Sequence, residues 1–177
     1  GEISISMVEE LLCKYVIIGH SERRQHFNEN DLIISEKLIL INDTDITPIV
    51  CIGETLKEKE SGNAVKVIEK QLNNIFNKIN INNNKDLIIA YEPVWAIGTG
   101  LTPKLKDIQN IHSIIREKLG EIYSSTNADK ARIIYGGSVT PKNALELLNL
   151  EDVDGALVGG ASLNWQDFWA IAECCPT

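Results

Sequence analysis

The sequence predicts an α/β protein built on a parallel β-sheet. Five short apolar runs recur along the chain, and segments with apolar residues at helical spacing lie between them. The apolar runs are continuous rather than alternating, which is typical of strands buried on both faces. Strands that are each followed by a helix pair in parallel through right-handed crossovers.

The strands are expected at the apolar runs, and a helix is expected after each of them. Pro103 opens the longest helix, because proline suits the first position of a helix. Thr140 precedes another helix, and its side chain is a candidate cap. The predicted strands are Tyr15–Gly19, Pro48–Gly53, Leu87–Tyr91, Arg132–Gly136 and Gly155–Gly159. The predicted helices are Asp31–Ile41, Ala64–Ile79, Pro103–Tyr123, Pro141–Leu150 and Trp165–Ala172.

Two architectures accommodate this series of strands and helices: an open doubly wound sheet and part of a (β/α)8 barrel. A whole barrel needs about 250 residues and eight strand–helix units. The chain has 177 residues, and five units are visible in it. Its length suits one domain with a substantial core.

The composition excludes several classes of protein. The formal net charge of −8 argues against a nucleic-acid partner. Hydrophobic residues make up 44% of the chain, but no uncharged apolar run approaches the length of a membrane span. A soluble globular protein without a membrane partner is therefore expected.

The four cysteines predict a reducing, intracellular location rather than a metal site. They show neither zinc-ligand spacing nor a redox Cys-x-x-Cys. Cys13 and Cys51 lie in or beside apolar runs, so buried, reduced thiols are expected there. Cys174 and Cys175 are adjacent near the end of the chain and are candidates for reactivity.

The predicted strand Leu87–Tyr91 ends on a carboxylate, Glu92, which is followed by Pro93. The next residues, 94–100, form an apolar segment that ends in glycines. A carboxylate at the end of a buried strand, beneath a loop that can move, suggests a base under a lid. A structural glutamate explains Glu92 equally well when the residue is considered alone.

His20 follows the first predicted strand and precedes a short helical turn. The positive end of that turn disfavours an imidazolium and leaves a neutral ring that can donate to a substrate oxygen. A histidine bonded to the backbone is favoured when the residue is considered alone. His26 shows no such context, and His112 lies on a predicted helix with nothing catalytic nearby.

Paired glycines close the last two predicted strands. Gly136 and Gly137 precede Ser138, and Gly159 and Gly160 follow the fifth strand. Glycines at neighbouring strand ends let backbone N–H groups approach an anion closely. In barrels, the loops after the last two strands often form a phosphate site. Each pair alone is also compatible with a plain turn.

Taken together, these motifs resemble the triosephosphate isomerase family, and the match runs from Gly1 to Leu163. The resemblance implies that residues 1–177 are a partial (β/α)8 TIM barrel, a truncated five-stranded parallel portion equivalent to units four to eight of the family. The matching motifs are His20-Ser21-Glu22-Arg23-Arg24, Cys51-Ile52-Gly53-Glu54, Tyr91 through Gly100, Tyr135-Gly136-Gly137-Ser138 and Leu157-Val158-Gly159-Gly160-Ala161-Ser162.

The resemblance implies the interconversion of glyceraldehyde 3-phosphate and dihydroxyacetone phosphate, in glycolysis and gluconeogenesis, without metal or cofactor. Glu92 matches the family's base, and His20 matches its neutral electrophile. The backbone groups implied in phosphate binding are those of Gly98, Ser138, Gly159 and Gly160. The supporting residues implied by the same motifs are Glu22, Cys51, Glu54, Tyr91, Trp95 and Tyr135, of which Glu54, Tyr91 and Trp95 match the lid's hinge partners.

The chain also departs from the family pattern. The family's first three strands, which carry an active-site lysine and a nearby asparagine, have no counterpart in it. The chain alone is therefore expected to be inactive, and Glu22, which pairs with that lysine in the family, is expected to reach solvent. Leu101 and Pro103 replace a usual lysine and a small residue at the lid's far hinge. Asn28 replaces a glycine, and asparagine tolerates left-handed conformations.

A five-stranded remnant leaves both sheet edges bare. Either a longer protein supplies the remaining strands or two copies associate. The start at Gly1 looks like a truncation. The family implies a homodimer in the full-length protein and a cytoplasmic location, with an organellar copy left open.

Two other functions were weighed from the sequence. Another phosphate-binding barrel, of the indole-glycerol-phosphate or phosphoribosyl isomerase type, would share the glycine pairs but not the runs around His20 and Glu92. A non-catalytic half-barrel that binds a phosphate or a protein would keep the anion site without turnover.

Overall fold

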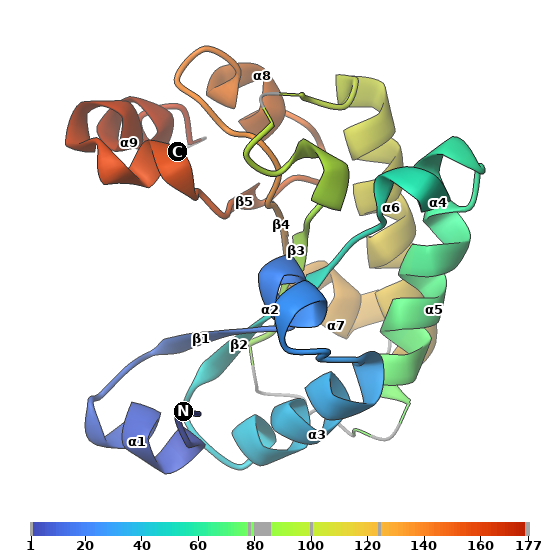
Figure 1. Ribbon diagram of the computed structural model, residues 1–177, viewed down its shortest axis with the longest axis vertical. Helices are drawn as coiled ribbons and strands as arrows, with labels where there is room; N and C mark the ends of the chain where they lie inside the picture. Colours follow the sequence, from blue (N-terminus) through green and yellow to red (C-terminus); the bar gives the residue numbers. More distant parts are fainter. Residues whose placement is uncertain (1, 78, 80–85, 100, 124, 176–177) are drawn as a thin grey trace.

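The computed structural model describes residues 2–77, 79, 86–99, 101–123 and 125–175. It contains a five-stranded parallel sheet in the order β1-β2-β3-β4-β5 (Figure 1). The strands are β1 Tyr15–Ile18, β2 Thr47–Ile52, β3 Ile88–Tyr91, β4 Arg132–Tyr135 and β5 Gly155–Ala156. Every predicted strand is confirmed, with ends that differ by one residue or, in β5, by three.

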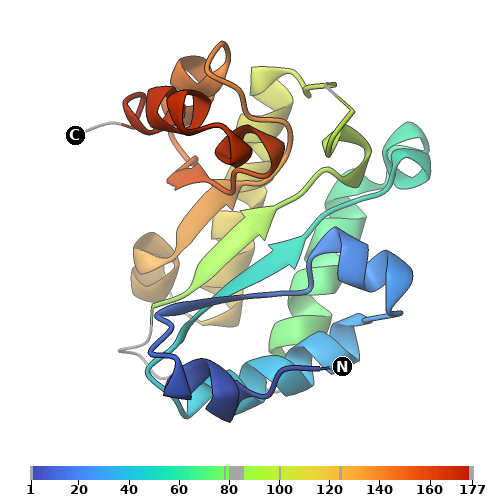
Figure 2. The same ribbon diagram turned by 60° about the vertical axis from the view of Figure 1, so that its left-hand side comes forward.

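The strand order distinguishes the two architectures. Each crossover advances by one strand in the same direction, and the strands run side by side (Figure 2). A doubly wound sheet reverses its order at a switch point, whereas a barrel keeps chain order. The sheet is therefore a portion of a (β/α)8 barrel, as expected.

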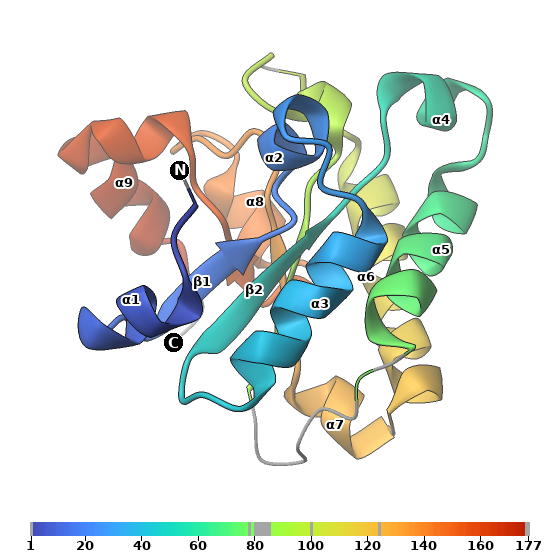
Figure 3. The same ribbon diagram turned by 60° about the horizontal axis from the view of Figure 1, so that its bottom comes forward.

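Helices cover one face of this sheet. The helices α3, α5 and α6 lie side by side along it, with α3 against β1 and β2, α5 against β2 and α6 against β4 (Figure 3). The helices are α1 Ile5–Glu10, α2 Ser21–His26, α3 Asp31–Asn42, α4 Leu56–Glu60, α5 Ala64–Phe76, α6 Leu105–Ile122, α7 Ser125–Lys130, α8 Ala144–Leu148 and α9 Trp165–Ala172. Two 3₁₀ turns, η1 Val94–Ala96 and η2 Gly160–Leu163, follow β3 and β5.

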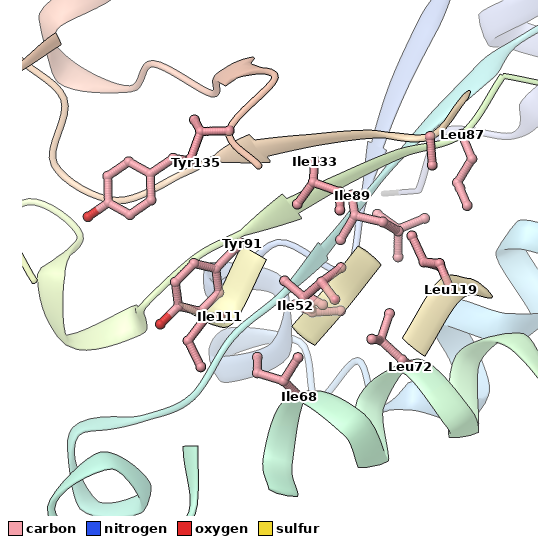
Figure 4. Close-up of a cluster of buried hydrophobic side chains, with 14 of the residues drawn as sticks. Ile52, Ile68, Leu72, Leu87, Ile89, Tyr91, Ile111, Leu119, Ile133 and Tyr135 are labelled. Carbon is pink, nitrogen blue, oxygen red and sulfur yellow. The ribbon is translucent and has the colours of Figure 1, made fainter. Parts of the chain in front are cut away.

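The hydrophobic core lies between the sheet and these helices. Side chains from α5 and α6 meet outward-facing side chains of the central strands (Figure 4). Members of this cluster are Ile68 and Leu72 of α5, Ile111 and Leu119 of α6, Ile52 of β2, Ile89 and Tyr91 of β3, and Ile133 and Tyr135 of β4. This core holds the carboxyl ends of β2, β3 and β4 in fixed register.

The opposite face of the sheet is only partly covered. All four residues of β3 are buried, but Tyr15 and Ile17 of β1 are 52% and 44% exposed. The expectation that every strand is buried on both faces is therefore wrong for β1. Among the described strands, β1 lies at one sheet edge and pairs only with β2, while β5 lies at the other edge and pairs only with β4. Two bare edges are as expected.

Several helix ends differ from the sequence expectation. Pro103 lies outside α6, whose N-cap is Lys104. Thr140 does not cap α8 through its side chain; its carbonyl oxygen accepts from the N–H groups of Asn143 and Ala144, and α8 begins at Ala144. The helix α5 ends at Phe76, before the predicted Ile79. Short apolar spacing predicts that a helix exists better than it predicts where the helix ends.

The two cysteines in the first third of the chain differ in burial. Cys51 is buried as expected, but the expectation that Cys13 is buried is wrong: Cys13 lies between α1 and β1 and is exposed. Among the described ranges, no helix is both long enough and apolar enough to cross a membrane.

Candidate active site

His20 and Glu92 meet at one edge of the sheet. His20 follows β1 and Glu92 follows β3, and parallel strands bring their carboxyl ends to the same edge. The imidazole Nε2 lies 3.1 Å from the carboxylate Oε1 of Glu92. The two side chains therefore lie close enough to contact one small molecule.

The tautomer of His20 follows from its place at the start of α2. Its Nδ1 accepts a hydrogen bond of 3.3 Å from the backbone N–H of Glu22. An acceptor nitrogen carries no proton, so the proton of the neutral ring lies on Nε2, which faces Glu92. The ring can thus present an N–H to a carbonyl oxygen at this edge.

Glu92 is only 2% exposed and is held by neighbouring donors. Its Oε2 accepts from the backbone N–H of Ser21 at 3.0 Å. Burial raises the pKa of Glu92, while the nearby His20 and the N–H of Ser21 oppose the rise. A carboxylate with a raised pKa is a stronger base near neutral pH.

Cys51 and a glycine define the space around that carboxylate. Burial, and next the charge of Glu92, raise the pKa of the Cys51 thiol, so the thiol stays protonated. A Cβ on Gly136 would lie 2.9 Å from Cγ of Glu92. Glycine at position 136 therefore leaves the room that the Glu92 side chain occupies.

The three expected hinge residues are brought together beside the site. Glu54 accepts from the Trp95 indole N–H at 2.7 Å and from the Tyr91 hydroxyl at 3.1 Å. Lys59 of α4 lies 3.2 Å from the centre of the Trp95 ring, on its face. Glu54 is buried, which raises its pKa. The first turn after β3 is thereby attached to the loop after β2.

His112 packs against two of the expected supporting residues, a contact that the sequence did not predict. Its ring lies edge-on to Tyr91, with centroids 5.7 Å apart, and 6.4 Å from the ring of Tyr135. His112 is bonded to the backbone carbonyl of Asp152, as expected for a structural histidine, and its ring neighbours are the supporting residues Tyr91 and Tyr135. Its spacing from Ile108 and Ile115 on α6 was the available signal, because residues three and four apart share one helix face.

Arg24 is a second residue that the sequence analysis did not assign. Its Nε donates to the carbonyl of Gly19 at 2.9 Å, and its Nη2 donates to the carbonyl of Cys51 at 3.2 Å. A third donor, Nη1, pairs with Asp31. The guanidinium thus ties the end of β1 to β2, directly behind His20 and the Cys51 thiol.

The expected phosphate-binding residues lie on the turns after β3, β4 and β5. Gly98 has a left-handed φ of 67°, and apart from its chain neighbours no described residue comes within 4 Å of where its Cβ would be. Gly159 and Gly160 have equally open backbones. The carbonyl of Ser138 accepts from the Asn143 amide, which orients the turn after β4.

Two further expectations concern α2 and its end. Glu22 is exposed, as expected for a carboxylate without its family partner. Asn28 adopts a left-handed φ of 55°, a conformation that asparagine tolerates, as expected. In the part of the chain that the structure describes, no group of three or more His, Cys, Asp or Glu side chains is placed to hold a metal ion.

Comparison with known proteins gives one consistent result. The family model described as "Triosephosphate isomerase" matches residues 1–175. The triosephosphate isomerase of Hydrogenovibrio crunogenus is 49% identical over 98% of this chain and 68% of its own length. The enzymes of Moorella thermoacetica and Rhodopirellula baltica are 49% and 44% identical and are covered over 69% and 70% of their lengths.

Proposed function

Because the chain belongs to the triosephosphate isomerase family, we propose that Glu92 and His20 are the base and the electrophile of its isomerase reaction. The reaction interconverts glyceraldehyde 3-phosphate and dihydroxyacetone phosphate in glycolysis and gluconeogenesis. The observation that carries the residue assignment is the 3.1 Å approach of His20 Nε2 to Glu92 Oε1 at the carboxyl edge of the sheet.

In the proposed mechanism one proton moves between adjacent carbons. The Glu92 carboxylate takes the proton from the carbon beside the carbonyl, and the N–H at Nε2 of His20 hydrogen-bonds to the carbonyl oxygen as charge develops there. The former carbonyl oxygen takes the Nε2 proton of His20, and His20 takes the proton of the neighbouring hydroxyl in its place. The protonated carboxyl returns its proton to the former carbonyl carbon, so that the carbonyl and the hydroxyl have exchanged places. Burial of Glu92 supports this role, because it strengthens the base.

The remaining site residues have supporting roles in this proposal. The N–H of Ser21 orients the carboxylate of Glu92, and the neutral Cys51 thiol is assigned a supporting role beside it. The contacts of Glu54 with Tyr91 and Trp95 hold one end of the lid, and Tyr135 packs beside Tyr91. The phosphate is bound by backbone N–H groups of Gly98, Ser138, Gly159 and Gly160, and Gly98 reaches it when the lid closes.

The assembly proposed for this function is a complete barrel in a homodimer in the cytoplasm. Residues 1–177 form units four to eight of that barrel. The chain spans 68 to 70% of the length of the relatives named above, and the family's active-site lysine has no counterpart in it. We therefore expect the 177-residue polypeptide alone to show negligible turnover, since electrostatic stabilisation is often the largest catalytic contribution.

Complementation tests this proposal. The purified chain is mixed with a polypeptide that carries the first three strands of the Hydrogenovibrio crunogenus relative, and triose-phosphate isomerisation is assayed. We expect activity only in the mixture. Glu92→Gln and His20→Gln should each lower it by a factor of about 100 or more, whereas His26→Gln, an exposed control on α2, should not.

Two outcomes would contradict the proposal. Full activity of a Glu92→Gln mixture would remove the base assignment. Binding of inorganic phosphate without turnover in any mixture would instead favour a non-catalytic half-barrel.

A further inference from the structure

Gln71 connects the outer helix α5 to the point where β2 ends. Its side-chain amide makes two hydrogen bonds to the backbone of a single residue, Gly53. The N–H of Gly53 donates to Oε1 at 2.9 Å, and Nε2 donates to the carbonyl of Gly53 at 3.0 Å. A primary amide that bonds both backbone groups of one residue restrains that residue in position and in orientation.

These two bonds lie where the regular pairing of the sheet stops. The pairing of β2 with β3 ends at Ile52 and Tyr91. Gly53 is the next residue and is buried. A buried backbone N–H and C=O need partners, and Gln71 provides one for each. An apolar side chain at position 71 would leave both groups unsatisfied.

Gly53 is in close contact with the main chain of Glu92. A Cβ on Gly53 would lie 1.7 Å from the carbonyl oxygen of Glu92. On one side of Gly53, the carbonyl of Ile52 accepts from the N–H of Glu92 at 2.8 Å. On the other side, the carbonyl of Glu54 accepts from the N–H of Val94 at 3.1 Å. The segment from Ile52 to Glu54 is therefore hydrogen-bonded both to Glu92 and to Val94, two residues later.

We propose that Gln71 is a positioning residue for Glu92 and for the hinge carboxylate of Glu54. It acts through Gly53 and touches neither the carboxylates nor the place of the substrate. The importance of this restraint for catalysis rests on the proposed function. The restraint itself does not, because it exists without substrate. Loss of the amide frees Gly53, and the backbone of Glu92 and the Trp95–Glu54 bond loosen with it.

A purely structural role for Gln71 makes a different prediction, and Gln109 of α6 provides the matched control. Gln109 makes the same kind of two-point contact: its Nε2 donates to the Asp152 carboxylate at 2.7 Å, and its Oε1 accepts from the N–H of Asp152 at 3.2 Å. Both glutamines are half-buried on neighbouring helices. Gln109 contacts the loop before β5 and not the segment around Gly53.

The experiment compares Gln71→Met with Gln109→Met by NMR on the 177-residue chain. The two readouts are the exchange rate of the Glu92 amide proton and the chemical shift of the Trp95 indole N–H, identified with a Trp95→Phe sample. In Gln71→Met we expect exchange at Glu92 to rise by about tenfold and the indole resonance to move away from its hydrogen-bonded position. Gln109→Met should lower the melting temperature without either change.

A second variant keeps the test sound if Gln71→Met does not fold. Gln71→Glu has the same shape, keeps an acceptor for the N–H of Gly53 and loses the donor to its carbonyl at neutral pH, so we expect smaller changes in the same direction. Unchanged signals in a folded Gln71 variant, or equal changes in Gln109→Met, would overturn the proposal. Neither readout needs turnover, so an incorrect assignment of Glu92 as the base would leave these signals as expected.

Discussion

The imidazole of His112, on α6, is completely buried. Its Nδ1 donates to the carbonyl of Asp152 at 3.0 Å, and burial lowers the pKa of His112 to about 4. The facing charged and titratable groups are Asp152, Asp154 and Arg116, together with the rings of Tyr91 and Tyr135. The neutral ring is thus part of the packing behind Tyr91 and Tyr135.

The first prediction concerns acid stability. The folded pKa of His112 is below the unfolded value of 6.5, so its contribution to stability is present above about pH 6.5 and is lost as the pH falls through about 4. Relative to His112→Gln, the native chain should lose on the order of 3 kcal/mol of unfolding free energy over this window. Urea unfolding at several pH values measures the difference.

Exposed His26 is the control for that measurement. The His26→Gln chain should follow the pH dependence of the native protein. A His112→Gln chain with the same pH dependence as the native protein would contradict the explanation from burial.

Glu92 gives the opposite pH dependence. Burial raises its pKa, so the folded state binds the proton more tightly than the unfolded chain, and stability falls as the pH rises through the folded pKa. Glu92→Gln should therefore be more stable than the native chain at pH 8, by on the order of 1 kcal/mol. The advantage should vanish below the ordinary pKa of a glutamate.

Differential scanning calorimetry between pH 4 and pH 8 measures this effect. The exposed Glu36 on α3 is the control. Glu36→Gln should not become more stable than the native chain as the pH rises from 4 to 8. A Glu92→Gln chain that is less stable than the native chain at pH 8 would mean that the bond from Ser21 outweighs the cost of burial.

The N-termini of α6 and α9 differ in how they are capped. Asn164 caps α9, and its side chain accepts from the N–H groups of Gln166 and Asp167 at 2.9 and 3.1 Å. Lys104 is the N-cap of α6, and its side chain makes no capping bond. A cation beside the positive end of a helix is also unfavourable.

A better cap should therefore stabilise α6. Lys104→Asp places a short acceptor and a negative charge at the N-cap, and the free energy of unfolding should rise by about 1 kcal/mol. Lys104→Gln is the matched control, because it removes the charge without providing a short acceptor. Urea midpoints at neutral pH decide the matter: an equal gain in both variants would show that charge alone is responsible.

At the scale of the whole molecule, several large apolar side chains are not covered by any described residue. Tyr15 and Ile17 of β1 are half exposed, and β1 is an unpaired edge. On α9, Trp165 and Trp169 are 73% and 62% exposed. Apolar edge strands promote association with other chains.

The isolated 177-residue chain should therefore self-associate. Light scattering after gel filtration should show a mass that rises with protein concentration. Ile17→Lys, which places a charge on the β1 edge, should shift the chain towards the monomer. Leu56→Lys on α4, a similarly exposed position away from the sheet edge, should not. A native chain that stays monomeric at all concentrations would contradict this prediction.

Much of this arrangement was predictable from local patterns. Continuous apolar runs located all five strands, and Trp165–Ala172 was located with its observed bounds. The starts of α6 and α8 were not, because Pro103 and Thr140 are favourable helix starters in general and their neighbours determine whether the helix begins there. The prediction that β1 is buried on both faces was also wrong, because a continuous run of apolar residues does not show whether another element covers the strand.

The amino-acid order alone determined the parallel sheet, its crossovers and the edge at which His20 and Glu92 are found, because the carboxyl ends of parallel strands share one edge. Only the tertiary structure decided which nitrogen of His20 faces Glu92 and that His112 lies behind Tyr91. It also showed that Gln71 restrains Gly53 from the outer helix. Those facts depend on contacts between residues far apart in the chain, whose distances and burial no local pattern contains.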